Sequence, residues 1–565
     1  MKLPAVALTP ALTLFAFSAL AQEVAVPAAG TAPEPEAPAA PVAPEPAPTV
    51  AAVPVAATPS APPELVAPPP PRPVITAVGD DGNPLAGWHN GVFYLRDATD
   101  DYRLYVQGRA QIDFYSYAGS GVADVPTLKP TLFLRRIRPE IGGEFFKSWW
   151  FSIAGDFGAT NQDNRTGTNE TSAAAPGVAP TATSGRYNSA QTVRISAAPT
   201  DVFINYRAHP LFNVQVGQFD APFTMENRTS DKFIPFMERS LAVRDVGIPT
   251  NKEIGAMVWG EMPSKHWFYS AGLFDGDGQN RLNTDSRGDV MLRTFVHPLA
   301  DRKSELKDLQ IGGSLRYGSR DSKWTNYDYP AMSTQGGWAF WNPTYTGSEG
   351  VTHVIPSGNQ LGLAGEVRIP VSIVDLTSEV VYVNNHTREA QDGDQGSGTS
   401  LRRGGIHGVS YYIQAGLWLG KRDVNGLPGY ENMTHVDFSK PDGPPANSVQ
   451  LLAKWEQLSL KYASASRAGT VDTKNIDGDI KVNAFSLGVN YWATKHIRLT
   501  ANYVLSMFPD SAPTSVSTKG SSGPLQSASN RALAPGNTLS PGVNDNARDN
   551  AQALHEFLLR CAVAL

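Results

Sequence analysis

The segment Tyr102–Tyr115 alternates between apolar and polar residues with almost no interruption. One side carries Leu104, Val106, Gly108, Ala110, Ile112 and Phe114, and the other carries Arg103, Gln107, Arg109, Gln111, Asp113 and Tyr115. Because successive side chains of a strand point to opposite faces, this pattern predicts a strand with one apolar and one polar face. About ten such residues, when tilted, cross the hydrocarbon layer of a bilayer. Half-buried strands of soluble sheets have the same pattern, so one strand does not distinguish the two.

The same alternation recurs along most of the remaining chain. It is found at 149–157, 212–217, 267–273, 309–317, 409–419, 485–491 and 497–506. No long segment with a helical period of 3.6 residues separates these strands. The pattern therefore predicts an all-β chain from about residue 74 onward.

The connections between these strands are of two kinds. Some are short, as at 493–495. Others are long and polar, at 158–190, 275–289, 319–358, 385–407, 422–447 and 508–550. Short turns at one end and long loops at the other are typical of an outer-membrane barrel, whereas a soluble domain rarely carries so many long loops. We therefore predict a transmembrane antiparallel β-barrel with long extracellular loops.

The C-terminal segment supports a closed barrel. His555, Phe557, Leu559, Cys561, Val563 and Leu565 fall on one face, and Glu556, Leu558, Arg560, Ala562 and Ala564 on the other. A strand that runs to the last residue suits a barrel that closes on itself, since every backbone group in lipid needs a partner within the protein. The pattern places Cys561 on the lipid face as a small apolar residue.

The first 73 residues differ in composition from the barrel. Residues 1–21 have the positive start, apolar core and small-residue cleavage pattern of a secretory signal peptide. Residues 22–73 are rich in proline and alanine and contain no aromatic residue, so we expect a disordered, extended linker. The expected domains are thus the signal peptide at 1–21, the linker at 22–73 and the barrel at 74–565, in a protein exported to the bacterial outer membrane.

The sequence gives little indication of reaction chemistry. Ser120 lacks the strand–turn–helix context of a nucleophile elbow. The stretch Phe274–Gln279 resembles a calcium loop, but its glycine stands at position 4 where position 6 is required. The net charge of −6 is modest, and the single cysteine excludes an internal disulfide. We therefore expect no enzymatic activity, no cofactor, no metal and no nucleic-acid partner.

Several stretches resemble the phosphate-selective porin family, the group of porins O and P. They are Gly87–Leu95, Val106–Asp113, Leu132–Gly142, Val216–Phe223 and Leu487–Trp492, scattered over most of the chain after residue 85. The resemblance implies a barrel of about sixteen strands, a homotrimer surrounded by outer-membrane lipid, and diffusion of small anions such as phosphate or polyphosphate. The proline-rich segment lies outside the resemblance.

In such a pore the functional chemistry is ion selectivity, set by charged residues that line the lumen. Alternation places Arg109, Arg136 and Arg138 on the polar face and would turn Arg135 outward. The resemblance implies that arginines at 109, 135 and 136 belong to a basic ladder at the constriction, which for Arg135 requires a bulge or the end of the strand to re-aim the side chain. Guanidinium groups match phosphate oxygens well. The alternative is that these arginines are only paired with wall carboxylates such as Asp113, Glu140 and Glu144.

A basic segment after Pro222–Phe223 is a second candidate. Arg228, Lys232, Arg239 and Arg244 lie in a long connection that we interpret as a possible lumen loop. Charge on the surface of an ordinary loop explains these residues equally well.

Three other interpretations of the sequence are alternatives to a porin. The first is a structural or adhesive barrel that its proline-rich arm anchors to the cell wall. The second is an outer-membrane hydrolase, for which the spacing of serine, histidine and acidic residues gives no support. The third is a soluble β-sandwich.

Overall fold

A computed structural model gives the fold. It describes residues 77–89, 92–119, 130–158, 198–248, 251–341, 343–347, 350–391, 393–420, 438, 447–466, 476–508 and 553–564. These residues all fall within the compact unit Val74–Leu565. The signal peptide, the proline-rich linker and Ser120 lie outside the described residues and stay predictions.

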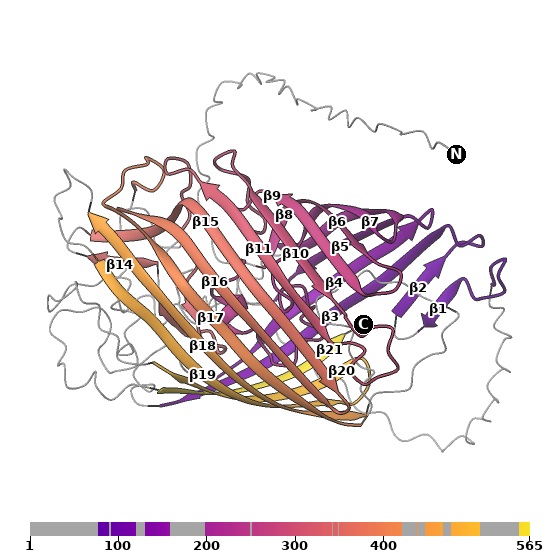
Figure 1. The fold of residues 1–565 in the computed structure, drawn as a ribbon. Coiled ribbons are helices and arrows are strands. Elements are labelled where there is room, and N and C mark those ends of the chain that lie inside the picture. Colours follow the sequence, from indigo (N-terminus) through magenta and orange to yellow (C-terminus); the bar gives the residue numbers. More distant parts are fainter. Residues whose placement is uncertain are drawn as a thin grey trace, which may run out of the picture. The chain divides into compact units, whose positions relative to one another are not determined.

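Sixteen strands of the described residues form one ring (Figure 1). They are β3 (Tyr102–Ala118), β4 (Thr131–Phe145), β5 (Trp149–Asp156), β6 (Ala198–His209), β7 (Phe212–Asp220), β8 (Lys252–Glu261), β9 (Trp267–Phe274), β10 (Asp289–Val296), β11 (Gln310–Arg320), β15 (Gly350–Val371), β16 (Val374–Gln391), β17 (Arg402–Leu419), β18 (Ser448–Ser466), β19 (Ile476–Trp492), β20 (Ile497–Met507) and β21 (Ala553–Ala564).

Antiparallel pairing closes the ring. Each of these strands pairs with the next along the chain, and the last strand, β21, pairs with β3, from His555 opposite Ala118 to Ala564 opposite Arg109. Closure leaves no open sheet edge in the spanning part of the barrel, as hydrocarbon requires. The predicted antiparallel barrel of about sixteen strands is confirmed.

Smaller elements extend or fill the ring. The hairpin of β1 (Ala86–His89) and β2 (Val92–Arg96) pairs with the start of β3, beyond the end of β21. The short strand β14 (Thr344–Gly347) likewise pairs with β15 beyond the end of β11. The remaining elements are the pair β12 (Met332–Ser333) and β13 (Ala339–Trp341) and the one-turn helix α1 (Leu241–Arg244). In the described part of the chain, no helix is long and apolar enough to cross a membrane.

The two faces of the strands differ as the alternation predicts. On β3, Val106 and Ile112 are each 44% exposed on the outside, whereas Gln111 and Asp113 are buried. On β21, Leu559 is 50% exposed and Arg560 is buried. The outer wall is therefore apolar and the inner wall carries the charges, which is the arrangement of a membrane barrel with a polar interior.

The structure corrects one predicted connection and the expected position of another. The stretch 385–407 is mostly strand, because β16 continues to Gln391 and β17 begins at Arg402. The stretch 422–447 joins β17 to β18 at the end of the barrel where the tight turn Val371–Val374 lies, so a long connection also occurs at the short-turn end. Composition alone did not show either point, because these strands carry polar residues on their inner face and composition does not record at which end a loop lies.

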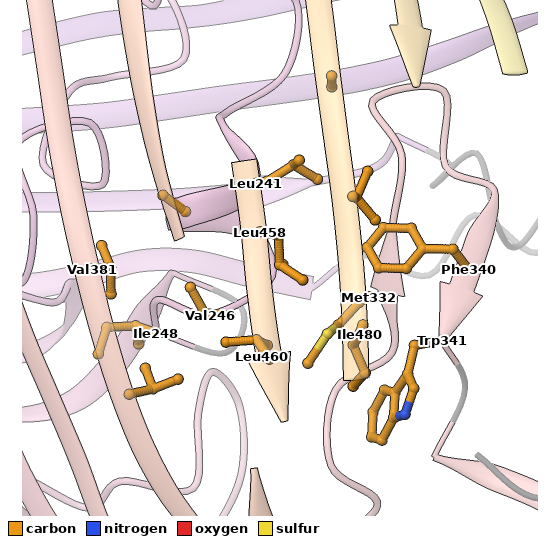
Figure 2. Close-up of a cluster of buried hydrophobic side chains, with 14 of the residues drawn as sticks. Leu241, Val246, Ile248, Met332, Phe340, Trp341, Val381, Leu458, Leu460 and Ile480 are labelled. Atoms are coloured by element: carbon orange, nitrogen blue, oxygen red, sulfur yellow. The ribbon is translucent and has the colours of Figure 1, made fainter. Parts of the chain in front are cut away.

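The lumen also contains an apolar cluster. Wall residues such as Val381, Leu458, Leu460 and Ile480 are fully or almost fully buried. They pack against side chains from the connections between β7 and β8 and between β11 and β15, including Leu241, Val246, Ile248, Met332, Phe340 and Trp341 (Figure 2). Part of the lumen is thus filled by side chains of two inward-folded segments.

Candidate anion-binding site in the lumen

The connection between β7 and β8 crosses the lumen, and we call its residues 221–248 the lumen loop. Its backbone N–H groups bind the opposite wall: Met225 and Glu226 donate to Glu379 on β16, at 2.7 and 2.8 Å. Leu241 donates to Glu456 on β18 and Met237 donates to Asn502 on β20. Buried peptide groups require hydrogen-bond partners, and wall side chains supply them to this irregular backbone segment.

Five arginines on three neighbouring strands face this loop. Arg109 lies on β3, Arg135, Arg136 and Arg138 on β4, and Arg560 on β21. We call these five residues the basic wall. Its strands β21, β3 and β4 are contiguous in the ring, so the seam that closes the barrel runs through the site.

A β-bulge explains how adjacent arginines share one face. The β3–β4 register shifts between Gln111, which pairs with Arg136, and Ile112, which pairs with Leu134. Arg135 is the extra residue, and its side chain binds Glu238 of the lumen loop. Strict alternation would have turned Arg135 toward lipid, and the bulge re-aims it into the lumen.

Asp231 of the lumen loop binds three arginines of the basic wall. Its carboxylate oxygens lie 2.9 Å from Arg109 Nε, 2.9 Å from Arg136 Nε and 3.0 Å from Arg138 Nη1. Arg138 also binds Asp156 of β5, at 2.6 Å. Asp231 is buried, so the loop brings one carboxylate into the middle of the arginine cluster.

Glu238 makes the second contact between the loop and the wall. It lies 3.0 Å from Arg135 Nε, 3.4 Å from Arg136 Nη2 and 3.0 Å from Arg560 Nη2. Arg560 in turn forms a two-pronged pair with Asp113 across the β21–β3 seam, at 2.8 and 2.7 Å. The cluster therefore contains five arginines and the four carboxylates of Asp113, Asp156, Asp231 and Glu238, an excess of one positive charge.

Both loop carboxylates are held in the charged form. Burial alone would raise the pKa of Asp231, but Arg109, Arg138 and Arg136 hold that pKa well below its usual range. Burial likewise opposes ionisation of Glu238, and Arg135, Arg136 and Arg560 lower its pKa below the usual range. The two side chains are thus anions at neutral pH.

The predicted basic residues of the loop have other neighbours. Arg228 donates to the carbonyl oxygen of Asp220, and Arg239 donates to the carbonyls of Glu226, Asn227 and Thr229. Arg244 binds Asp245 and the carbonyl of Ser333. Lys232 lies 3.7 Å from Glu140 of β4. The structure therefore brings together the four wall arginines that the sequence predicted, and it uses most of the basic loop residues to hold backbone carbonyl groups.

Four members of the site were missed by the sequence reasoning: Asp156, Asp231, Glu238 and Arg560. For Arg560 the signal was available, because it lies on the polar face of the C-terminal strand. For the loop, each basic residue has an acidic residue close by in the chain, such as Asp231 next to Lys232 and Glu238 next to Arg239. That pattern shows that the loop carries both charges, but it does not show whether the acidic or the basic side chains contact the basic wall.

The acidic turn after β9 is occupied by protein donors. Asp277 accepts hydrogen bonds from Thr284 and from the Tyr327 hydroxyl, and it lies 3.4 Å from Arg320. The N–H groups of Gly276 and Gly278 bind Glu253. The described residues contain no group of three metal-ligating side chains.

A closed barrel with an apolar outer wall and a charged lumen crossed by a loop defines a channel of the outer-membrane porin class. Residues 105–302 match the model of the family described as phosphate-selective porin O and P. The match confirms, over those residues, the family resemblance that the motifs indicate.

Solved structures of outer-membrane channels are similar in arrangement, at low identity. They include OmpT of Vibrio cholerae with loop L8 deleted, with a TM-score of 0.43, 9% identity and coverage of 82% of this chain and 100% of that one. DcaP, an outer membrane channel of Acinetobacter baumannii, has a TM-score of 0.40, 11% identity and coverage of 85% and 100%. An anion-selective porin from Comamonas acidovorans has a TM-score of 0.37, 10% identity and coverage of 82% and 100%. No curated protein matches the sequence.

Proposed function

We propose that this porin gives passive diffusion to small anions, phosphate or polyphosphate foremost, through a pore lined by the basic wall. The observation that carries the proposal is the contiguous set of five arginines on β21, β3 and β4, which face the loop that narrows the lumen. Guanidinium groups bind oxyanions through fixed pairs of N–H donors. Several such groups in series let an anion move from one to the next without being trapped.

The first test is electrical. In a planar lipid bilayer with a KCl gradient, we expect a reversal potential on the anion side and a block of the chloride current by added inorganic phosphate. Arg109→Ala and Arg136→Ala should each raise the phosphate concentration for half block roughly tenfold, since each removes charged hydrogen-bond donors. Lys147→Ala is the matched control, because Lys147 is 66% exposed in the tight turn between β4 and β5 and pairs only loosely with Asp101, at 3.7 Å.

Other outcomes would change the assignment. A cation-directed or unselective current that is indifferent to phosphate would retain the porin and remove the anion specificity. A protein that inserts but conducts nothing would favour the structural or adhesive barrel.

We further propose that residues 1–21 direct export, that the barrel assembles as a homotrimer as its family resemblance implies, and that the segment 22–73 contacts the cell wall. The proposed cell-wall contact is supported by the position and the ion pairs of the segment that leads into the barrel. The β1–β2 hairpin joins β3 at the end of the barrel where the tight turns lie, which in such barrels is the periplasmic end. Arg96 of β2 is buried there and binds Asp81 and Asp100, which fixes the start of the barrel to the chain that precedes it.

Deletion of residues 23–73 tests the proposed cell-wall contact. We expect the truncated porin to conduct as before but to be extracted more readily from isolated envelopes by mild detergent. Extraction identical to that of the full chain would show that the segment is only a spacer.

A further inference from the structure

The two loop carboxylates stand where a permeating anion would have to bind. Asp231 is within 3.0 Å of three arginines, and Glu238 is within 3.4 Å of three, with Arg136 shared by both. The side chains of Asp231 and Arg136 are only 3% and 5% exposed. Any oxyanion that reaches these guanidinium groups meets a carboxylate that already belongs to the protein.

Asp231 lies close to Arg109 and Arg136 but does not satisfy all of their hydrogen-bond donors. Arg109 Nε and Arg136 Nε are buried and near Asp231, yet neither forms a hydrogen bond with it, because the direction of the N–H is wrong. Asp231 Oδ1 is likewise buried without a hydrogen bond. The carboxylate thus neutralises the arginines through its charge and leaves N–H donors unused, and an unused buried donor favours any ligand that satisfies it.

An oxyanion with more oxygens and more charge than a carboxylate satisfies such donors better. A chloride ion brings one charge and no directional acceptor pair, whereas a phosphate dianion brings two charges and several acceptor oxygens. Competition with an internal carboxylate therefore disfavours chloride more than it disfavours phosphate. The same competition lowers the net charge of the cluster, which lets a bound anion leave.

We propose that Asp231 and Glu238 are specificity-determining residues of the pore: they act as built-in counter-anions that a permeating anion must displace, and they thereby discriminate multivalent oxyanions from monovalent anions. This inference rests on the proposed anion-channel function. It gives a role in selectivity to the acidic residues of the lumen loop, whereas the sequence pattern drew attention to the basic ones.

The test compares Asp231→Asn and Glu238→Gln with the unmodified porin in planar bilayers. Each change keeps the shape of the side chain and removes its charge. We expect a higher chloride conductance, a reversal potential shifted further to the anion side, and half block of the chloride current at a roughly tenfold higher concentration of inorganic phosphate, because chloride gains more than phosphate from the loss of the internal competitor. Asp245→Asn is the control, since Asp245 lies in the same loop and is buried, but it binds Arg244 and Ser333, not the basic wall.

Two results would overturn the inference while the unmodified porin stays anion-selective. One is an unchanged selectivity and phosphate block in both variants. The other is a rise in conductance for cations and anions alike, which would mean that the carboxylates only tether the loop. If Asp231→Asn does not fold, the Glu238→Gln variant carries the same expectation. If the unmodified porin itself shows no anion current, the proposed function fails, and this result is distinct from failure of the inference.

Discussion

Replacing Arg560 by methionine is expected to destabilise the folded barrel by about 3–5 kcal/mol, the usual cost of removing one partner of a buried ion pair. The side chains of Arg560 and Asp113 are both 0% exposed, and the pair bridges β21 and β3, the two strands that close the ring. Methionine fills much of the space but leaves Asp113 charged without its guanidinium partner. Arg560 also donates to the carbonyl of Met237, so the lumen loop loses an anchor at the same time.

The measurement is the urea midpoint of unfolding in detergent, followed by the mobility difference between the folded and heated protein on a gel. Arg302→Met is the control, since Arg302 is 73% exposed and 3.9 Å from Asp301, a surface pair worth about 0–1 kcal/mol. The double variant Asp113→Asn/Arg560→Met should recover part of the loss, because it leaves no uncompensated charge. Equal midpoints for Arg560→Met and Arg302→Met would show that the seam does not depend on this pair.

The barrel was predictable from sequence because its physical rule is local. Whether a side chain of β3 or β21 faces lipid or lumen depends on the parity of its position, that is, on whether it is odd or even along the strand. Lipid on one side enforces this alternation over the full length of each strand. The parity of Arg109 and Arg560 therefore follows from their immediate neighbours. Arg135 departs from this rule because a single extra residue in β4 shifts the outward positions from even numbers, Leu132 and Leu134, to odd numbers such as Ile141.

The site was less predictable because its contacts are distant in sequence. Asp231 reaches Arg109 and Arg136 only because the chain between β7 and β8 folds into the lumen, and no periodic pattern governs an irregular segment. Its burial depends on wall acceptors such as Glu379 and Glu456, which lie on strands far along the chain. The composition of the loop indicated a charged segment that could fold into the lumen or lie on the surface. Only the fold shows that its carboxylates meet the arginines while its basic residues mostly hold carbonyl groups.

The apolar part of the lumen gives the second large expected effect. Trp341 is completely buried among the lumen-filling residues and packs against Tyr329 and Tyr462, with ring centroids 5.8 and 6.3 Å apart. Replacing Trp341 by alanine should cost about 3–5 kcal/mol of packing, as for other buried tryptophans. Because Trp341 lies in the connection between β11 and β15, we expect this cost to fall on the inward-folded segment more than on the strands of the ring.

The expected result of Trp341→Ala is therefore a channel with higher, noisier single-channel conductance, since the segment at 329–341 no longer stays packed against β18 and β19. Trp324→Ala is the matched control from the same connection, because Trp324 is 55% exposed and should leave the conductance unchanged. The anion-to-cation selectivity should persist, because the basic wall lies on β21, β3 and β4 and is held by the lumen loop. A steady current of unchanged size in Trp341→Ala would mean that this segment does not restrict the path of ions, and that the narrow part of the pore is made by the lumen loop alone.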